Sequence, residues 1–310
     1  MSKCIVLMFH EINDVAWFER TLKFIGRKYG FVSFHELRDR IENSNLGDSI
    51  AHITFDDGHR SFYDNAFPVL KKLSLPSTLF VSPQVIEQEH NYWFQRVRPL
   101  QSTDFRQLLI TKVRMLFNGD ISNYSTHAIL KSLPYFLMDQ IVSTYENDHP
   151  DLKLPYMNVY KGQLIEMSDS GLVEIGAHTV NHPILANESD NDSAFEINDS
   201  IRCLNKLVNK PIRAFAYPNG QPVMDFGQRE MKFLRDAGIE LAFSTESRSM
   251  YNKADHMRIP RIGVSKGNPF YVTQKIRFAK QWIQLRNLAF RNTELKDRKQ
   301  LLKIRKANGL

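Results

Sequence analysis

Short apolar runs alternate with segments of helical periodicity along most of this chain. Runs rich in β-branched and aromatic residues predict strands at residues 4–9, 49–55, 77–81, 173–177, 213–217, 241–244 and 257–264. Between them, apolar residues recur at helical spacing over residues 18–29, 61–73, 197–208 and 230–237. Repeated β–α units predict a parallel sheet or barrel, and therefore the α/β class.

Length and composition fit one large domain. The chain has 310 residues, of which 42% are hydrophobic, enough for a single α/β barrel. Its two cysteines, Cys4 and Cys203, have neither disulfide-framework nor metal-motif spacing. The apolar run 4–9 is too short for the core of a signal peptide or for a membrane span. From the sequence we therefore expect a cytoplasmic protein without signal peptide or transmembrane segment, peripheral at most to the inner membrane.

Positive charge is concentrated at the C-terminal end. The formal net charge is +7, whereas residues 271–310 contain eleven Lys and Arg against two acidic residues. Val272, Ile276, Ala279 and Ile283 predict an amphipathic helix that packs on the barrel, with Trp282 beside it. For the Lys/Arg-rich end we expect first a solvated helix and second a contact with acidic membrane lipids or an anionic glycan. Nucleic-acid binding ranks last because no recognised binding motif accompanies the charge.

Two motifs carry candidate chemistry. Asp56 and Asp57 end one strand run in Thr-Phe-Asp-Asp-Gly, and His178 and His182 follow another in His-Thr-Val-Asn-His. Taken alone, the first is most often a turn and the second a structural pair. One carboxylate and two imidazoles, however, form an open hydrolytic metal site that leaves a coordination position for water or substrate. The second carboxylate is then free to act as a base.

Three long runs resemble the first three motifs of the polysaccharide deacetylases, also called the NodB-homology or carbohydrate esterase family 4 enzymes. They are residues 53–81, 171–185 and 213–220, in the family's order. The resemblance covers about residues 3–264 and implies a distorted (β/α)7-type barrel. We expect a catalytic barrel over 1–268 with a helical insertion at about 84–160, followed by a basic helical tail over 269–310.

The resemblance implies roles for the clustered residues. Asp57, His178 and His182 would hold a divalent metal, most often Zn²⁺, although Co²⁺, Ni²⁺ and Fe²⁺ occupy similar sites. Asp56 would be the general base that takes a proton from the attacking water. Arg213 occupies the position of the arginine that pairs with this base, which would keep the carboxylate ionised.

The remaining roles concern the oxyanion and the leaving group. The resemblance implies that the Tyr217 amide, in the turn Tyr-Pro-Asn-Gly, stabilises the oxyanion. For the proton donor we prefer His10, which closes the first strand, over His256 in the late segment; His10 could instead orient Asp56 or cap the strand. We expect structural or exposed roles for His35, His52, His59, His90, His127 and His149.

The chain also departs from a minimal deacetylase. The family's fourth motif is not recognisable, and Arg258 and Arg261 resemble a late arginine segment without an assignable role. In the insertion, Tyr92-Trp93-Phe94 is either a sugar-stacking platform or, more commonly for such clusters, part of a core.

These features predict a metal-dependent hydrolase that removes N-acetyl groups from an amino sugar in a glycan or glycan precursor, with an N-acetylated carbohydrate as partner. One alternative is hydrolysis of another amide or ester, including O-acetyl sugars. A second is a non-catalytic glycan- or membrane-binding scaffold, against which the intact Asp/His/His set and its neighbouring carboxylate argue. A third, a non-haem Fe(II) oxygenase, fits poorly because such enzymes are typically all-β.

Overall fold

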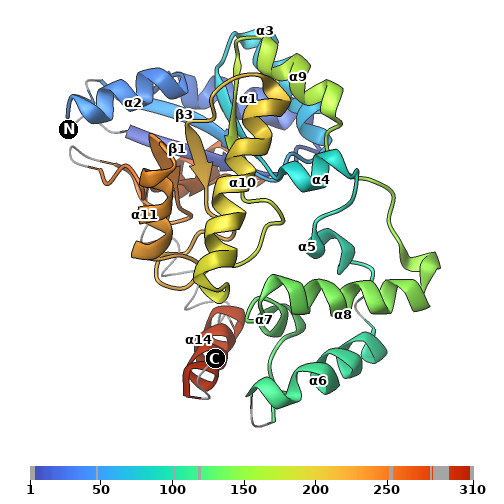
Figure 1. The fold of residues 1–310 in the computed structure, drawn as a ribbon. Helices are drawn as coiled ribbons and strands as arrows, with labels where there is room; N and C mark the ends of the chain where they lie inside the picture. Colours follow the sequence, from blue (N-terminus) through green and yellow to red (C-terminus); the bar gives the residue numbers. More distant parts are fainter. Residues whose placement is uncertain are drawn as a thin grey trace.

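Parallel strands form the centre of the molecule (Figure 1). The computed structural model describes residues 4–46, 48–100, 102–117, 120–250, 254–279, 281 and 293–307. Its strands are β1 (Cys4–Phe9), β2 (Gly30–Phe31), β3 (Ile50–Phe55), β4 (Ser77–Val81), β5 (Val173–Ala177), β6 (Ala214–Ala216), β7 (Leu241–Phe243) and β8 (Ile262–Gly263). They pair in the order β7-β6-β5-β4-β3-β1-β8, with β2 beside β3. Every paired strand is parallel to its neighbour.

The sheet curves into an incomplete barrel. A parallel bridge between Phe243 and Ile259 brings the segment that leads into β8 against β7, the opposite end of the strand order. Seven strands lie on the main path. The α/β class and the distorted (β/α)7-type barrel predicted from the sequence are confirmed. The late run 257–264 contributes only two residues of strand.

Helices cover the outside of the barrel. They are α1 (Val15–Gly26), α2 (Phe34–Glu42), a π-helix (Phe62–Ala66) that continues into α3 (Phe67–Leu73), α9 (Lys161–Asp169), α10 (Asp190–Val208), α11 (Gln228–Asp236) and α12 (Pro269–Arg277). The predicted apolar stripe of α1 is buried at Phe18, Leu22 and Ile25, and Asp14 caps its start by accepting from the Trp17 N–H. The apolar face of α1 is therefore packed into the barrel core.

The insertion forms a helical body with its own apolar core. Its helices are α4 (Pro83–Glu87), α5 (Trp93–Arg96), α6 (Thr103–Phe117), α7 (Thr126–Leu130) and α8 (Tyr135–Asp148). Phe105, Val113, Ile129 and Val142 are fully buried in a cluster distinct from the barrel core. Figure 1 shows α5 to α8 standing to one side of the barrel. This body shapes one flank of the molecule.

The C-terminal helix α14 (Thr293–Ala307) packs against α6 and α7 of the insertion. Leu301 is completely buried in the insertion core, and the buried Arg298 forms an ion pair with the buried Asp225. The prediction that the basic end is a solvated helix is therefore wrong for this face of α14, because it completes the core of the insertion. Trp282 and Ile283, placed in the predicted tail helix, lie outside the described residues.

We expect the substitution Leu301→Ala to lower the free energy of unfolding by about 2–4 kcal/mol, because it leaves a cavity in the insertion core. Lys303→Ala, on the exposed face of the same helix, is the control and should change the free energy by less than about 0.5 kcal/mol. Equilibrium urea unfolding measures both. If both substitutions changed the free energy of unfolding by the same small amount, the packing of α14 against the insertion would be contradicted.

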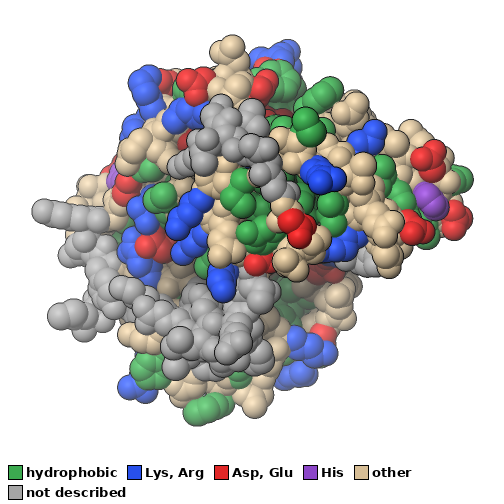
Figure 2. Space-filling view, turned by 90° about the horizontal axis from the view of Figure 1, so that it is seen from below, with side chains coloured by type: hydrophobic (Ala, Val, Ile, Leu, Met, Phe, Trp, Pro, Cys, Tyr) green, Lys and Arg blue, Asp and Glu red, His purple; other side chains and the backbone are tan. Residues whose placement is uncertain are grey.

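The described surface is mixed in character. Figure 2 shows Lys and Arg side chains interspersed with acidic ones on the face seen from below. Large apolar side chains are exposed at several positions, which are Val15, Met115, Phe136, Tyr160, Phe195, Val223, Phe270 and Phe278. Within the described ranges, no helix combines the length and the apolar character that crossing a bilayer requires.

Candidate active site

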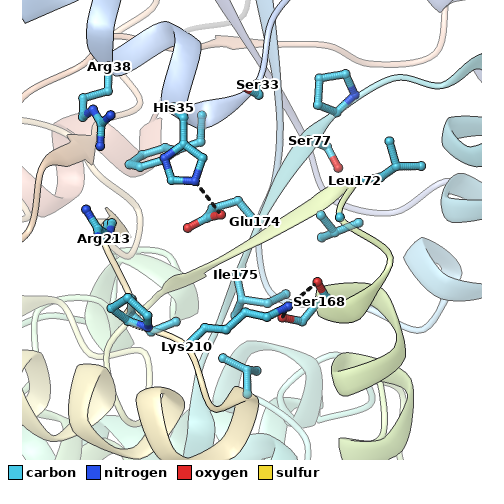
Figure 3. A pocket seen from close by; sticks show the side chains of 17 residues that line it. Ser33, His35, Arg38, Ser77, Ser168, Leu172, Glu174, Ile175, Lys210 and Arg213 are labelled. Carbon is cyan, nitrogen blue, oxygen red and sulfur yellow. Dashed lines mark hydrogen bonds and ion pairs between the residues drawn. The ribbon is translucent and has the colours of Figure 1, made fainter.

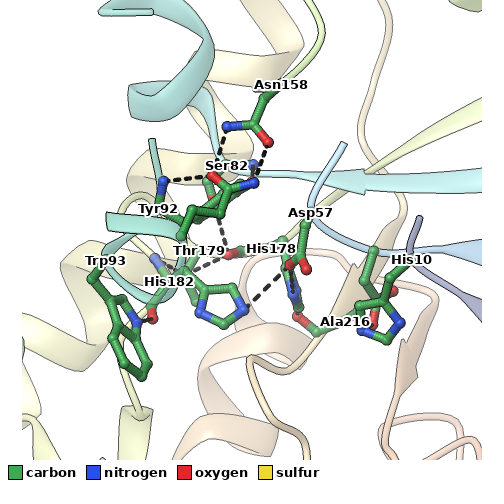
Figure 4. A network of polar contacts seen from close by, with 12 residues as sticks. His10, Asp57, Ser82, Tyr92, Trp93, Asn158, His178, Thr179, His182 and Ala216 are labelled. Atoms are coloured by element: carbon green, nitrogen blue, oxygen red, sulfur yellow. Dashed lines mark hydrogen bonds and ion pairs between the residues drawn. The ribbon is translucent and has the colours of Figure 1, made fainter. Parts of the chain in front are cut away.

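The candidate residues meet at the carboxyl edge of the sheet (Figure 4). Phe9 of β1 pairs with Phe55 of β3, so His10 and Asp56, the next residues, leave neighbouring strands at the same level. The His178 N–H, directly after β5, donates to the carbonyl of Val81 at the end of β4. Parallel strands thus deliver side chains from distant parts of the sequence to one rim.

Asp57, His178 and His182 form a compact group. Oδ1 of Asp57 lies 3.5 Å from Nε2 of each histidine, and the three candidate ligand atoms lie within 4.8 Å of one another. All three side chains are largely buried. The geometry brings together the three residues that the sequence motifs nominate as metal ligands.

The chemistry of this group fits a divalent cation. Oδ1 of Asp57 is buried and has no hydrogen-bond partner, although burial of a carboxylate oxygen without compensation is costly. Nδ1 of His178 lies 2.6 Å from the carbonyl of Ala216, which can only accept, so Nδ1 carries the proton and Nε2 presents its lone pair to the group. Burial, together with the nearby His178, lowers the pKa of His182 to about 3 and favours the neutral, ligating imidazole.

The backbone that carries the ligands is strained. Asp57, Thr179 and His182 have φ of 69°, 64° and 64°, in the left-handed region that non-glycine residues rarely adopt. The buried Glu196 of α10 stabilises the histidine loop, because its carboxylate accepts from the N–H groups of Val180 and Asn181 and from the Asn181 side chain. Glu196 lies in an ordinary helical pattern and belongs to no motif, so the sequence alone does not indicate its role.

The insertion contributes directly to the site. The Trp93 indole N–H donates to the His182 carbonyl (3.1 Å), and the rings of Tyr92 and Phe94 pack 5.4 and 5.0 Å from the His182 ring. Just before the insertion, the Ser82 hydroxyl donates to the His178 carbonyl. Tyr92 and Trp93 are buried, as expected if the cluster is part of a core. Phe94 is partly exposed beside His182. The aromatic cluster therefore combines core packing with one surface next to the candidate metal site.

We expect Trp93→Phe to weaken metal binding by about tenfold, because it removes the hydrogen bond that orients the His182 backbone while the ring packing is kept. Trp17→Phe is a matched control, since its indole N–H likewise donates to a backbone carbonyl, that of Gly267. Competition with a chromophoric chelator measures both affinities. Equal affinities in the two variants would contradict an orienting role for Trp93.

Asp56 is held by Arg261. The guanidinium donates from Nη1 and Nη2 to the two carboxylate oxygens at 2.5 and 2.8 Å, and both side chains are buried. Burial by itself would raise the pKa of Asp56, but the charges of Arg261 and His178 and the hydrogen bonds from Arg261 outweigh it and hold that pKa below its ordinary value. Asp56 is therefore an ionised carboxylate beside the candidate ligands, which a base requires.

The prediction that Arg213 pairs with Asp56 is wrong. Arg213 precedes β6 at the amino end of the sheet, opposite the candidate site, and its side chain pairs with Glu240. Figure 3 shows it lining a different pocket, near the pair formed by His35 and Glu174. Arg261, to which the sequence analysis assigned no role, fills the position instead because its side chain runs through the barrel interior, where Nε donates to the Ser244 carbonyl.

The prediction that the Tyr217 amide stabilises an oxyanion is also wrong. Its N–H already donates to the Phe243 carbonyl (3.1 Å) as part of the pairing between β6 and β7, and its hydroxyl donates to the Met257 carbonyl. Pro218 has no N–H. Within the described backbone, the next amide in this turn, that of Asn219, makes no hydrogen bond and has a φ of 58°. Tyr217 is thus a structural residue at the strand end.

His10 lies at the rim, half-exposed, with Nε2 4.0 Å from Oδ2 of Asp56. His256 is partly exposed, and its carbonyl accepts from the Ala242 N–H. Among the described residues, no side-chain interaction joins His256 to Asp56. The choice of His10 as proton donor remains a prediction, with its position in support.

Comparison with known proteins identifies the family. A family model described as polysaccharide deacetylase matches residues 43–242. The chain belongs to the polysaccharide deacetylase family. This confirms the resemblance seen in the three sequence motifs. Enzymes of this family generally depend on a divalent metal, and the Asp57, His178 and His182 group lies within the matched range.

Two curated relatives carry the name poly-β-1,6-N-acetyl-D-glucosamine N-deacetylase, and such enzymes are hydrolases of C–N bonds other than peptide bonds. The Staphylococcus epidermidis protein is 27% identical over 223 residues, which are 69% of this chain and 54% of the relative. The Staphylococcus aureus protein is 20% identical over 213 residues, 69% of this chain and 53% of the relative. The polysaccharide deacetylase chain described here therefore spans about half the length of these relatives.

Solved structures of deacetylases share the fold. The Streptococcus pyogenes deacetylase PplD, solved with acetate, superposes with a TM-score of 0.61 at 20% identity and covers 88% of this chain and 98% of its own. IcaB from Ammonifex degensii gives a TM-score of 0.59 at 20% identity, with 90% and 98% coverage. At these identities the comparison supports the barrel rather than a particular substrate.

Proposed function

We propose that this protein is a metal-dependent hydrolase that removes N-acetyl groups from amino sugars of a polysaccharide. The observation that carries the proposal is the Asp57, His178 and His182 group with a second, ionised carboxylate, Asp56, beside it. A glycan-binding scaffold would have no need of a buried carboxylate held ionised beside three candidate ligands. The names of the curated relatives support N-acetylglucosamine as the sugar.

The residues divide the work of amide hydrolysis. Asp57, His178 and His182 would hold the cation, which when bound supplies Lewis-acid polarisation of the amide carbonyl and acidification of water. Asp56, fixed by Arg261, accepts the proton of the attacking water. His10, at the same rim, donates a proton to the nitrogen of the leaving amine. Asn219 lies two residues after Tyr217 in the same turn, and its amide makes no hydrogen bond within the described backbone; we assign this amide to the oxyanion.

The donor set favours Zn²⁺. Two neutral imidazoles and one carboxylate are ligands that zinc accepts in catalytic sites, and Co²⁺ or Ni²⁺ accept the same set. Hydrolysis of O-acetyl sugars or of other amides is the alternative on the same site, because the assigned roles require an acyl carbonyl and a leaving atom that accepts a proton, and both nitrogen and oxygen meet that requirement.

The proposal also covers the division of the chain into a barrel, an insertion and a tail. We assign residues 1–268 to the catalytic barrel, about 84–160 to the insertion and 269–310 to the tail. Lys296, Lys299 and Lys303 are exposed at positions i, i+3 and i+7 of α14, on one helix face. They support a peripheral contact of this face with an anionic membrane or glycan.

Acetate release tests the proposed function. We expect zinc-loaded protein to release acetate from N-acetylglucosamine oligomers, and chelation to reduce the rate at least about 100-fold, because it removes the Lewis acid. Re-addition of Zn²⁺, Co²⁺ or Ni²⁺ should restore the rate and rank the metals. Release from O-acetylated sugars alone would establish the alternative. No release from either class, with metal bound, would overturn the deacetylase proposal.

A further inference from the structure

A second pocket lies where the insertion meets the barrel. Its cavity volume is about 590 Å³, within the range of ligand sites. We call it the insertion pocket; its lining residues include Gln84 of α4, His90, Arg96 of α5, Tyr135, Asp139, Ser143 and Asn147 of α8, Tyr156 and Asn181. The four α8 residues recur every four positions and therefore share one helix face.

The insertion pocket adjoins the candidate active site. Asn181 lies between His178 and His182 in the sequence, and its side chain is held by Glu196. Asn91 and Arg96, which line the pocket, flank the aromatic residues that pack against His182. Phe94, the partly exposed member of that group, lies 5.0 Å from the His182 ring. The pocket lining is therefore connected, through Asn181 and α5, to the loop and the aromatic cluster that surround His182.

The lining indicates the chemistry of the ligand. Arg96 is already paired with Asp139 and Glu146, so the main charges of the pocket compensate one another and an ionic ligand gains little. Large apolar side chains are scarce, which excludes an apolar ligand.

Several polar side chains of the pocket lining are available to hydrogen-bond a ligand. Gln84, His90 and Tyr135 are partly buried, and within the described residues their side chains make no hydrogen bond; Nδ1 of His90 is a buried atom without a partner. Such groups donate and accept without net charge. A neutral ligand with many hydroxyl groups, and with a face for the Tyr135 and Tyr156 rings, matches this combination.

We propose that the insertion pocket is a saccharide subsite that binds a sugar unit of the glycan away from the N-acetyl group that reacts. The inference rests on the proposed function for the identity of the glycan. It assigns a role to the insertion: the enzyme selects oligosaccharides over single sugars because the longer chain occupies both places. Hydrogen bonds from Gln84 and Asn147 contribute to that selection.

The test uses pentasaccharides of N-acetylglucosamine, β-1,6- and β-1,4-linked, and calorimetric titration into metal-loaded protein carrying Asp56→Asn, which is expected to slow turnover strongly. Adding Gln84→Ala and Asn147→Ala should weaken pentasaccharide binding about tenfold. Gln140→Ala, an exposed α8 residue outside the pocket lining, is the matched control and should leave the affinity unchanged. In protein with Asp56 intact, the ratio of kcat/KM for pentasaccharide to that for monosaccharide should fall about tenfold with the double substitution.

Failure of this inference is distinguishable from failure of the proposed function. Pentasaccharides that do not bind, or that bind the double variant as tightly as its parent, would overturn the subsite even if acetate is released. If no sugar releases acetate but binding is lost only in the double variant, the deacetylase proposal fails and the saccharide subsite stands.

Discussion

Replacing Asp56 by Asn is expected to lower the rate of acetate release by roughly 10²–10⁴-fold while the bound metal is retained. The amide is nearly isosteric but cannot accept the proton of the attacking water. Asp57, His178 and His182 are untouched by the substitution, so the affinity for metal should change little. Steady-state acetate assays and metal analysis of the same preparation measure the two properties.

Asp57→Asn provides the contrast for that experiment. Oδ1 of Asp57 lies 3.5 Å from both histidine Nε2 atoms, so this variant should lose metal and activity together. If Asp56→Asn also loses the metal, the separation into base and ligand is wrong. Full activity of metal-loaded Asp56→Asn would remove Asp56 from the mechanism.

Arg261→Met should have the largest effect on stability, lowering the free energy of unfolding by about 3–5 kcal/mol. The substitution leaves the buried Asp56 carboxylate without its bidentate partner, and Met fills much of the space without replacing the charge. The pKa of Asp56 should rise as a consequence, so any residual activity should shift to higher pH. Urea unfolding and a pH–rate profile measure these effects.

A double-mutant cycle separates the ion pair from mere loss of packing. In the Asp56→Asn background, Arg261→Met should cost substantially less, because the unpaired charge is absent. Arg213→Met is the matched control: its partner Glu240 retains Arg38, and the pair is partly exposed, so the cost should stay below about 1 kcal/mol. A larger loss of activity in Arg213→Met than in Arg261→Met would restore the original assignment of Arg213.

The sequence was sufficient for the strands, the α/β class and the metal-ligand candidates, because these depend on local signals. Alternation and length mark β3 and β5, and a carboxylate or imidazole directly after a parallel strand must lie at the carboxyl edge. His178 was found for this reason, and His182 because it closes the motif His-Thr-Val-Asn-His. The helix predicted over 61–73 was also present, although it begins as a π-helix, a backbone detail that apolar spacing does not encode.

Only the tertiary structure decided which partners surround those residues. In the linear chain the resemblance pointed to Arg213 as the guanidinium partner, and Arg261 had no assignable role. Strand direction places Arg213 at the amino end of the sheet and Arg261 inside the barrel beside Asp56. The Tyr217 amide is unavailable because β7 pairs with β6, a contact between residues that the sequence separates widely.

The environment of the histidines was likewise beyond the sequence. Trp93 of the insertion and Glu196 of α10 hold the histidine loop through hydrogen bonds to its backbone. Every residue has the same backbone groups, so the sequence does not show which of them a distant side chain will contact. The burial of Leu301 and Arg298 in α14 was hidden by the surrounding positive charge. Local patterning therefore determined the elements and the reactive groups, whereas long-range packing, which no local signal encodes, determined how those groups are held.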